Sequence, residues 1–277
     1  MRWERSSYSI VSDIMDSFDK KIRKLKDVIN SAGSLLVSYS GGVDSTVLAV
    51  AAKEILPARM SCALIDSPLV SRSEIKEALE LAESLSLPCS FIKSDILEDN
   101  EFRENGRDRC YICKKKMSGL LLREAKVLGL DHVADGSNIA DLTKFRPGFQ
   151  AYEEAGIIHP FIEAGMDKED IRKLARIYRL PVSEKPSYSC LASRVPYGDQ
   201  LEEEILGEIE ASEDFIRSLG AGQVRVRKHG GIARIETDLG NFGLIISNSD
   251  EISSFLKQNG FRFVTLDLDG FVSGSLD

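Results

Sequence analysis

Two adjacent glycines mark the point where a buried strand pattern gives way to a helical one. The segment Ser40 to Ser45 reads Ser-Gly-Gly-Val-Asp-Ser, between the apolar stretch Leu35 to Val37 and the helix pattern Val47 to Leu56. Glycine allows positive φ and close backbone approach, and a helix N-terminus directs N–H groups and its dipole at an anion. The segment therefore predicts a phosphate loop, although a turn capped by Asp44 or Ser45 is the alternative.

Cysteine supplies the second chemical signal. Cys110 and Cys113 form a Cys-x-x-Cys pair, and Cys190 stands alone in a Ser, Pro and Gly-rich segment. Five cysteines are an odd number, which argues against a disulfide scaffold. The pair can bind zinc, act as a redox couple, belong to an iron–sulfur site or be incidental, and three thiols can hold a cubane cluster with one iron open. Cys62 and Cys89 lie in apolar strand segments and predict buried thiols.

Three arginines are candidates for anion binding. Arg225 and Arg227 alternate with valines on a strand pattern and therefore share one face, where they can bind a phosphate or carboxylate. A solvated strand face is the alternative. Arg194 stands four residues after Cys190, so it is the stronger candidate for an anion beside that thiol.

Two further residues follow strand patterns at the edge where open α/β sheets bind ligands. Asp66 ends the second pattern, and Gly136 stands in Asp135-Gly136-Ser137-Asn138 after a later one. Asp66 can instead cap the next helix, whereas Gly136 suits close approach to a nucleotide.

Alternating strand and helix patterns must position these residues. Strands are predicted near 35–37, 63–65, 90–92, 132–134 and 157–161, with helices over 47–56, 74–85, 114–128 and 168–178. This order predicts an α/β fold with a Rossmann-like parallel sheet and helices on both faces. A smaller α+β domain follows, with helices over 201–219 and 251–257, a hairpin of 223–227 and 232–236, and a strand over 262–268. The predicted domains are 1–190 and 191–277.

Composition narrows the class of protein. The chain has 277 residues and a net charge of -8, so an anionic substrate needs a local basic site, and extended nucleic-acid binding is disfavoured. The sequence contains no apolar run of about 20 residues and begins without the apolar stretch of a secretory signal. We expect a cytoplasmic protein without a membrane segment.

The loop resembles the PP-loop of ATP pyrophosphatases, which cleave ATP to AMP and pyrophosphate. The resemblance implies an adenine nucleotide alpha hydrolase-like fold, Mg²⁺ at Asp44, and ATP as the ligand that the sheet edge at Asp66 and Gly136 would bind. It also implies pyrophosphate contacts along the whole loop, namely Ser40, Gly41, Gly42, Val43, Asp44 and Ser45.

Most of the chain resembles one PP-loop family, the ATP-dependent sulfur transferases, or sulfide insertases, that make the nickel-pincer nucleotide cofactor of lactate racemase (the LarE family). The similar segments are Tyr39 to Ser45, Phe145 to Gly148, Ala164 to Arg172, Lys185 to Ser187, Cys190 to Arg194, Pro196 to Gly198, Val224 to Arg227, Ala233 to Glu236 and Leu266 to Ser275. Ala140 and Lys144 depart from the family, which usually carries acidic residues there.

This resemblance implies adenylation of a carboxylate of pyridinium-3,5-biscarboxylic acid mononucleotide and its conversion to a thiocarboxylate. It assigns anion binding to Arg225 and Arg227 and sulfur transfer to Cys190. Cys110, Cys113 and Cys190 are similar to the branch of the family that binds a [4Fe-4S] cluster, whose sulfide would be the sulfur. A homohexamer is also implied.

Three alternatives stay open. Cys190 can give up its own sulfur, as in another branch of the family. A tRNA thiolase also joins a PP-loop to such cysteines, but it usually has lysine in place of Val43. A nucleotide-binding iron–sulfur sensor would bind ATP without turnover.

Overall fold

The structure is a computed structural model that describes residues 4–142, 147–186 and 189–272, with side chains from residue 17 onward. The chain divides into two compact units. The first comprises residues 1–66, 75–93 and 110–187, and the second comprises 67–74, 94–109 and 188–277. A domain boundary after residue 190 stays a prediction.

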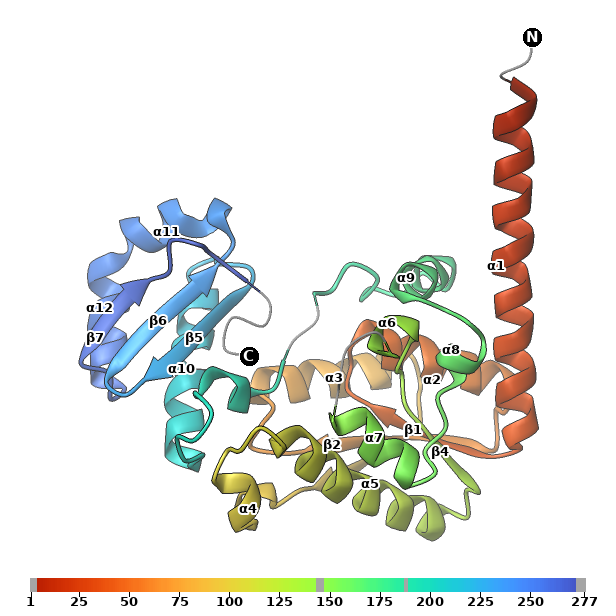
Figure 1. Ribbon diagram of the computed structural model, residues 1–277, viewed down its shortest axis with the longest axis horizontal. Coiled ribbons are helices and arrows are strands. Elements are labelled where there is room, and N and C mark those ends of the chain that lie inside the picture. Colours follow the sequence, from red (N-terminus) through yellow and green to blue (C-terminus); the bar gives the residue numbers. More distant parts are fainter. Residues whose placement is uncertain (1–3, 143–146, 187–188, 273–277) are drawn as a thin grey trace. The chain divides into compact units, whose positions relative to one another are not determined.

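The first unit contains a four-stranded parallel sheet in the order β3-β2-β1-β4. Its strands are β1 Leu35–Tyr39, β2 Met60–Asp66, β3 Cys89–Lys93 and β4 His132–Ala134. The larger helices are α1 Glu4–Ala32, α2 Val43–Ile55, α3 Arg72–Ser84, α5 Arg109–Leu128, α7 Pro147–Glu154 and α9 Lys168–Ile177, and the short ones are α6 Ile139–Leu142 and α8 Pro160–Glu163. Helices α2 and α3 cover one face and α5 covers the other (Figure 1), which confirms the predicted α/β fold.

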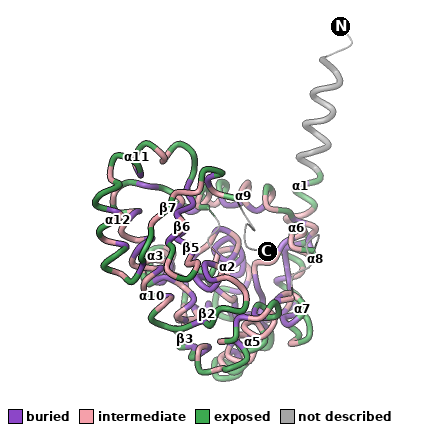
Figure 2. The backbone as a smooth tube through the Cα atoms, turned by 60° about the vertical axis from the view of Figure 1, so that its left-hand side comes forward, coloured by how far each residue is buried: buried purple, intermediate pink, exposed green. Residues whose placement is uncertain are grey.

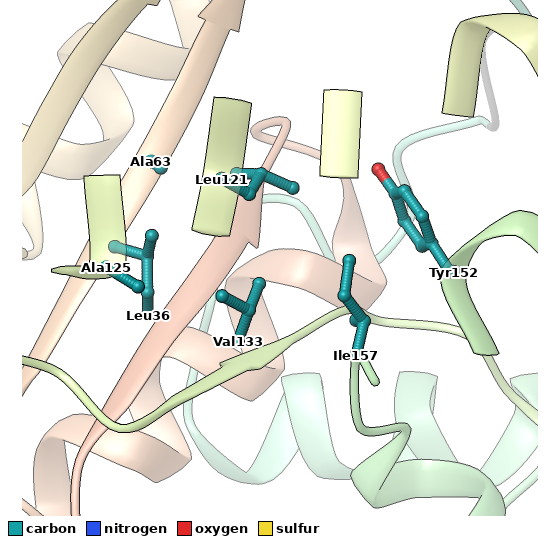
Figure 3. Close-up of a cluster of buried hydrophobic side chains, with 7 residues drawn as sticks. All are labelled: Leu36, Ala63, Leu121, Ala125, Val133, Tyr152 and Ile157. Carbon is teal, nitrogen blue, oxygen red and sulfur yellow. The ribbon is translucent and has the colours of Figure 1, made fainter. Parts of the chain in front are cut away.

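The core of this unit lies between the sheet and α5. Leu36 and Val133 from neighbouring strands pack against Leu121 of α5 and Ile157, and all four side chains are buried (Figure 3). The cluster also contains Ala63, Ala125 and Tyr152. Helix α2 on the opposite face is buried along most of its length, as Figure 2 shows. Burial on both sides of the sheet explains the continuous apolar strand patterns.

The predicted strand over 157–161 is wrong. Ile158 forms only an isolated parallel bridge with Ala134, and Pro160 opens helix α8. Proline has no N–H for a ladder but suits the first position of a helix. Helix α1, which the strand and helix patterns did not predict, packs against α2 and α8 through buried residues that include Leu25 and Ile29.

The second unit has a three-stranded sheet in the order β5-β6-β7. Strands β5 Val224–His229 and β6 Ile232–Thr237 form the predicted antiparallel hairpin, and β7 Phe263–Leu266 pairs parallel to β6. Helices α10 Glu203–Ser218 and α12 Ser249–Gln258 pack on β5 and β7 respectively. The remaining elements are α4 Asn100–Arg103, α11 Phe242–Ser247 and the 3-10 turns η1 Ile96–Glu98, η2 Leu191–Arg194 and η3 Leu239–Asn241. The predicted α+β organisation is confirmed.

In the part of the chain that the structure describes, every helix is too short or too polar to cross a bilayer.

The core cluster gives a stability prediction with a control on the same helix. Leu121 is completely buried, so Leu121→Ala removes packed atoms and leaves a cavity. We expect it to lower the free energy of unfolding by about 2–5 kcal/mol. Val127 on the same helix is 79% exposed, so Val127→Ala should change it by less than about 0.5 kcal/mol. Urea unfolding followed by circular dichroism measures both, and equal effects would contradict the packing described for α5.

Candidate active site

The glycine loop lies at the carboxyl end of β1 and opens helix α2. Gly42 is the N-cap of α2, and no side chain of the described residues caps this helix. The hydroxyl of Ser45 accepts a hydrogen bond from the N–H of Ser40 at 3.2 Å and donates to the Gly42 carbonyl at 3.2 Å. The alternative, a turn capped by Asp44 or Ser45, is therefore not what the structure shows. Uncapped N–H groups at a helix start are what an anion requires.

Two glycines of this region, Gly41 and Gly136, pack closely against neighbouring segments. Gly41 has a φ of 68°, and a Cβ there would lie 2.6 Å from the Cβ of Ala78. A Cβ at Gly136 would lie 3.0 Å from the carbonyl carbon of Asp44 and from the nitrogen of Ser45. Gly136 therefore seats the segment after β4 against the start of α2, and its contact with ATP stays a prediction.

Lys168 is the main residue that the sequence did not single out. Its ammonium group lies 2.7 Å from Oδ1 and 2.5 Å from Oδ2 of Asp44, so both carboxylate oxygens are bound. Burial raises the pKa of Asp44, and Lys168 opposes that rise. Asp167 caps α9 through a capping box, which fixes the helix start that carries Lys168. The loop thus has a cation, although its own motif contains none.

A buried polar network lies behind Gly136. Asp135 accepts a hydrogen bond from Nδ1 of His159 at 2.6 Å and one from the hydroxyl of Ser137 at 2.6 Å. Burial raises the pKa of Asp135, but these bonds and the charge of Lys114 outweigh it and hold the pKa below its usual value. An ionised Asp135 fixes the turn that follows β4. Asp66 ends β2, as predicted, and its role as an ATP contact stays a prediction.

The three candidate cysteines do not all belong to one unit. Cys110 and Cys113 lie near the start of α5 in the first unit, and Cys190 belongs to the second unit. The described residues form no group of three or more His, Cys, Asp or Glu that is arranged for a metal ion. As a donor set, three thiols suit an iron–sulfur cluster. Their convergence, and the magnesium at Asp44, stay predictions. Of the other thiols, Cys62 is buried as predicted, whereas Cys89 is only half-buried.

Hydrogen bonds hold the backbone of the segment that carries Cys190, and the Cys190 side chain is exposed. The Cys190 carbonyl accepts hydrogen bonds from the N–H and hydroxyl of Ser193 and from Nη1 of Arg194, at 3.0, 2.7 and 3.2 Å. Nη1 of Arg194 also donates to the carbonyl of Ser189 at 2.7 Å. These bonds hold the backbone on which the exposed thiol is carried.

Arg194 is held in turn by a buried carboxylate on α10. Its Nε and Nη2 bind the two oxygens of Glu213 at 2.8 and 3.0 Å, and both side chains are almost fully buried. The Arg194 guanidinium thus positions the Cys190 segment. Binding of a substrate anion by Arg194 stays a prediction, because most of its N–H groups already bond Glu213 and the Cys190 segment. Glu213, nineteen residues from Arg194, carried no signal in the sequence.

Arg225 and Arg227 share one face of β5, but their environments differ. Arg227 donates to Glu236 at 2.7 Å and to the Ser193 carbonyl at 2.7 Å. Arg225 is buried, yet it makes no hydrogen bond or ion pair with the described residues. Burial, with Arg194 and Arg227 nearby, lowers the pKa of Arg225 to about 10. The carboxylates of Glu236 and Glu213 offset this lowering only in part, and a buried cation so placed favours an anionic ligand.

Ala140, in α6, donates its backbone N–H to Asn138 at 3.0 Å. Lys144, Phe145 and Arg146 lie outside the described residues, as do Ser187 and Ser273 to Ser275. The structure therefore does not test the expectations that fall on those positions.

Comparison with known proteins gives three relatives that match nearly the whole chain. The sequence model of the NAD synthase family matches residues 10–106. A pyridinium-3,5-bisthiocarboxylic acid mononucleotide synthase of Lactiplantibacillus plantarum is 35% identical, over 87% of this chain and 88% of the relative. The chain belongs to the family of this synthase. Uncharacterized proteins of Synechocystis sp. and Methanocaldococcus jannaschii are 34% and 32% identical, over 94% and 91% of this chain and 97% of each relative.

Membership of this family of PP-loop sulfurtransferases confirms that the chain is an enzyme and an ATP-using PP-loop protein. The Rossmann-like fold is confirmed as well. The three-cysteine branch and the individual site residues stay predictions.

Lys168 gives the first prediction from this site. Lys168→Met removes the cation beside the loop but leaves the Asp167 cap, so we expect kcat/KM for ATP to fall about 10²-fold. Lys21→Met is the matched control. The Lys21 ammonium group, which α1 carries, lies 2.5 Å from Asp170 on the helix that also carries Lys168. Pyrophosphate release measures both variants. Normal ATP turnover in Lys168→Met, or an equal loss in Lys21→Met, would contradict a direct role for the ammonium group.

Glu213 gives the second prediction from this site. Glu213→Ala leaves buried Arg194 without its carboxylate, so we expect a loss of about 3–5 kcal/mol in unfolding free energy. Asp214→Ala, on the same helix, breaks a more exposed pair with Arg217 and should cost less than about 1 kcal/mol. Denaturant unfolding compares them, and similar losses would show that burial of the pair is unimportant.

Proposed function

We propose that this enzyme inserts sulfur into a pyridinium nucleotide. ATP activates a carboxylate of pyridinium-3,5-biscarboxylic acid mononucleotide as an acyl-adenylate, and a sulfide then converts it to a thiocarboxylate. The overall change is carboxylate, ATP and hydrosulfide to thiocarboxylate, AMP and pyrophosphate. The relative from L. plantarum, named for the bisthiocarboxylic product, supports this substrate.

The observation that carries the proposal is the environment of Arg225. Its guanidinium is buried beside Arg227, and it has neither a hydrogen bond nor an ion pair with the described residues. Since the chain has a net charge of -8, an anionic substrate depends on such local cations. The phosphate or a carboxylate of the nucleotide is the anion that we assign to Arg225 and Arg227.

The glycine loop serves the activation step. Hydroxide is a poor leaving group, so a carboxylate oxygen first attacks the α-phosphorus of ATP and expels pyrophosphate. The N–H groups at the start of α2 bind the departing pyrophosphate, and Lys168, 2.5 Å from Asp44, lies close enough to balance its charge. Mg²⁺ at Asp44 would supply further stabilisation of that charge. Asp66 and Gly136 are assigned to the same nucleotide.

The Cys190 segment serves the sulfur step. Arg194 and Ser193 bind its backbone, so the thiol has a defined position for attack on the acyl carbonyl or for holding the sulfur source. A [4Fe-4S] cluster held by Cys110, Cys113 and Cys190 would supply sulfide and leave the polypeptide intact. Exposure of Cys110 and Cys190 supports access of a sulfide or another sulfur donor. A homohexamer acting in the cytoplasm belongs to the same proposal.

The decisive experiment separates the two sulfur sources. Protein purified without oxygen is assayed for iron and sulfide per chain, incubated with ATP, sulfide and the pyridinium nucleotide, and analysed for AMP, thiocarboxylate and intact mass. We expect iron, AMP and thiocarboxylate, with no mass lost from the chain. The variants Cys110→Ser and Cys113→Ser should lose sulfur transfer, whereas Cys89→Ser, which alters a half-buried cysteine, should retain it.

Two results would overturn parts of the proposal. Metal-free protein that loses the mass of H₂S at Cys190, with Cys110→Ser and Cys113→Ser still active, would replace the cluster by sacrifice of Cys190. ATP binding without AMP formation in the presence of the nucleotide would reject sulfur insertion and favour a sensor. Thiolation of tRNA, with no thiolation of the pyridinium nucleotide, would identify a tRNA thiolase.

A further inference from the structure

Phe271 covers the guanidinium of Arg225. The Arg225 Cζ lies 4.3 Å from the centroid of the Phe271 ring, which is the distance of a cation–π contact. No hydrogen bond or ion pair within the described residues holds this guanidinium, so the ring is its one direct partner there. Unlike a carboxylate, an aromatic ring takes none of the guanidinium N–H groups as a hydrogen-bond acceptor.

A tight turn after β7 places Phe271. Asp267 accepts hydrogen bonds from the N–H of Asp269 through its side chain and from the N–H of Gly270 through its carbonyl, at 3.0 and 3.1 Å. Gly270 has a φ of 73°, and a Cβ there would lie 3.1 Å from the Thr237 carbonyl oxygen. Only glycine fits this position without strain. The turn is therefore built to a defined geometry just before the ring.

We propose that Phe271 is a positioning residue for the substrate anion. By stacking on Arg225 it fixes the plane of the guanidinium, so that two N–H groups point at the phosphate or carboxylate of the nucleotide. The ring also excludes water from one side of the cation without competing for its N–H groups, as a carboxylate would. This inference rests on the proposed function, because it takes Arg225 as the anion contact.

The test compares Phe271→Ala, Phe271→Leu and Phe271→Trp with Arg225→Ala and the double variant Phe271→Ala/Arg225→Ala. We expect Phe271→Ala and Phe271→Leu to raise the KM for the pyridinium nucleotide about 3- to 10-fold, with the KM for ATP unchanged. Phe271→Trp, which keeps an aromatic face, should stay near wild type. Adding Phe271→Ala to Arg225→Ala should cause no further change. Phe263→Ala is the control, because Phe263 lies 60% exposed under Arg262 and away from β5.

The outcomes separate this inference from the proposed function. A Phe271→Leu enzyme with wild-type KM would show that only apolar packing matters, and it would overturn the stacking role, as would an unchanged Phe271→Ala enzyme. An Arg225→Ala enzyme with wild-type nucleotide KM would instead remove the anion site itself. Circular dichroism melting of each variant shows whether a raised KM comes from unfolding, and a raised KM in a fully folded Phe271→Ala enzyme supports the proposal.

Discussion

Close backbone packing around the start of α2 is the constraint on which the first unit depends. Gly41 lies against Ala78 of α3, and Gly136 lies against Asp44 and Ser45. Three segments that are distant in sequence, the loop after β1, helix α3 and the turn after β4, therefore meet without side chains between them. This packing brings helix N–H groups, a carboxylate and a strand end to one edge of the sheet, where open α/β sheets bind their ligands.

Charge is arranged locally in a chain that is acidic overall. Arg194 and Arg227 are buried, and each has a buried carboxylate partner, Glu213 and Glu236 respectively. Those pairs neutralise the two arginines and fix the Cys190 segment and the hairpin, so Arg227 is the secondary contact, and Arg225 the main contact, in the anion site that we propose. Arg225 differs from them because an aromatic ring replaces the carboxylate. The contrast between Arg225, which has no direct ion pair with the described residues, and its two ion-paired neighbours makes Arg225 the main candidate for the substrate anion.

Periodicity and glycine motifs predicted the parallel sheet, the hairpin and the phosphate loop, because these depend on local pattern. The segment 157–161 was misassigned since an apolar run does not distinguish a strand from a single bridge followed by a proline-initiated helix. The pairs Lys168 with Asp44 and Arg194 with Glu213 depend on tertiary contact and leave no spacing signal. Asp167 before a helix pattern predicted the cap of α9. The direction of the next side chain, that of Lys168 toward Asp44, follows only from packing.

The bond between Lys168 and Asp44 has a thermodynamic consequence for the order in which ligands bind. A second cation that reaches Asp44 competes with an ammonium group that already contacts both carboxylate oxygens, so a metal ion alone would gain less than at a free carboxylate. A triphosphate changes this balance, because it offers the displaced ammonium a new anion. Linkage then makes the affinity for each ligand depend on the presence of the other. On the proposed function, the resting loop would therefore bind the metal–nucleotide complex as one unit in preference to a bare metal ion.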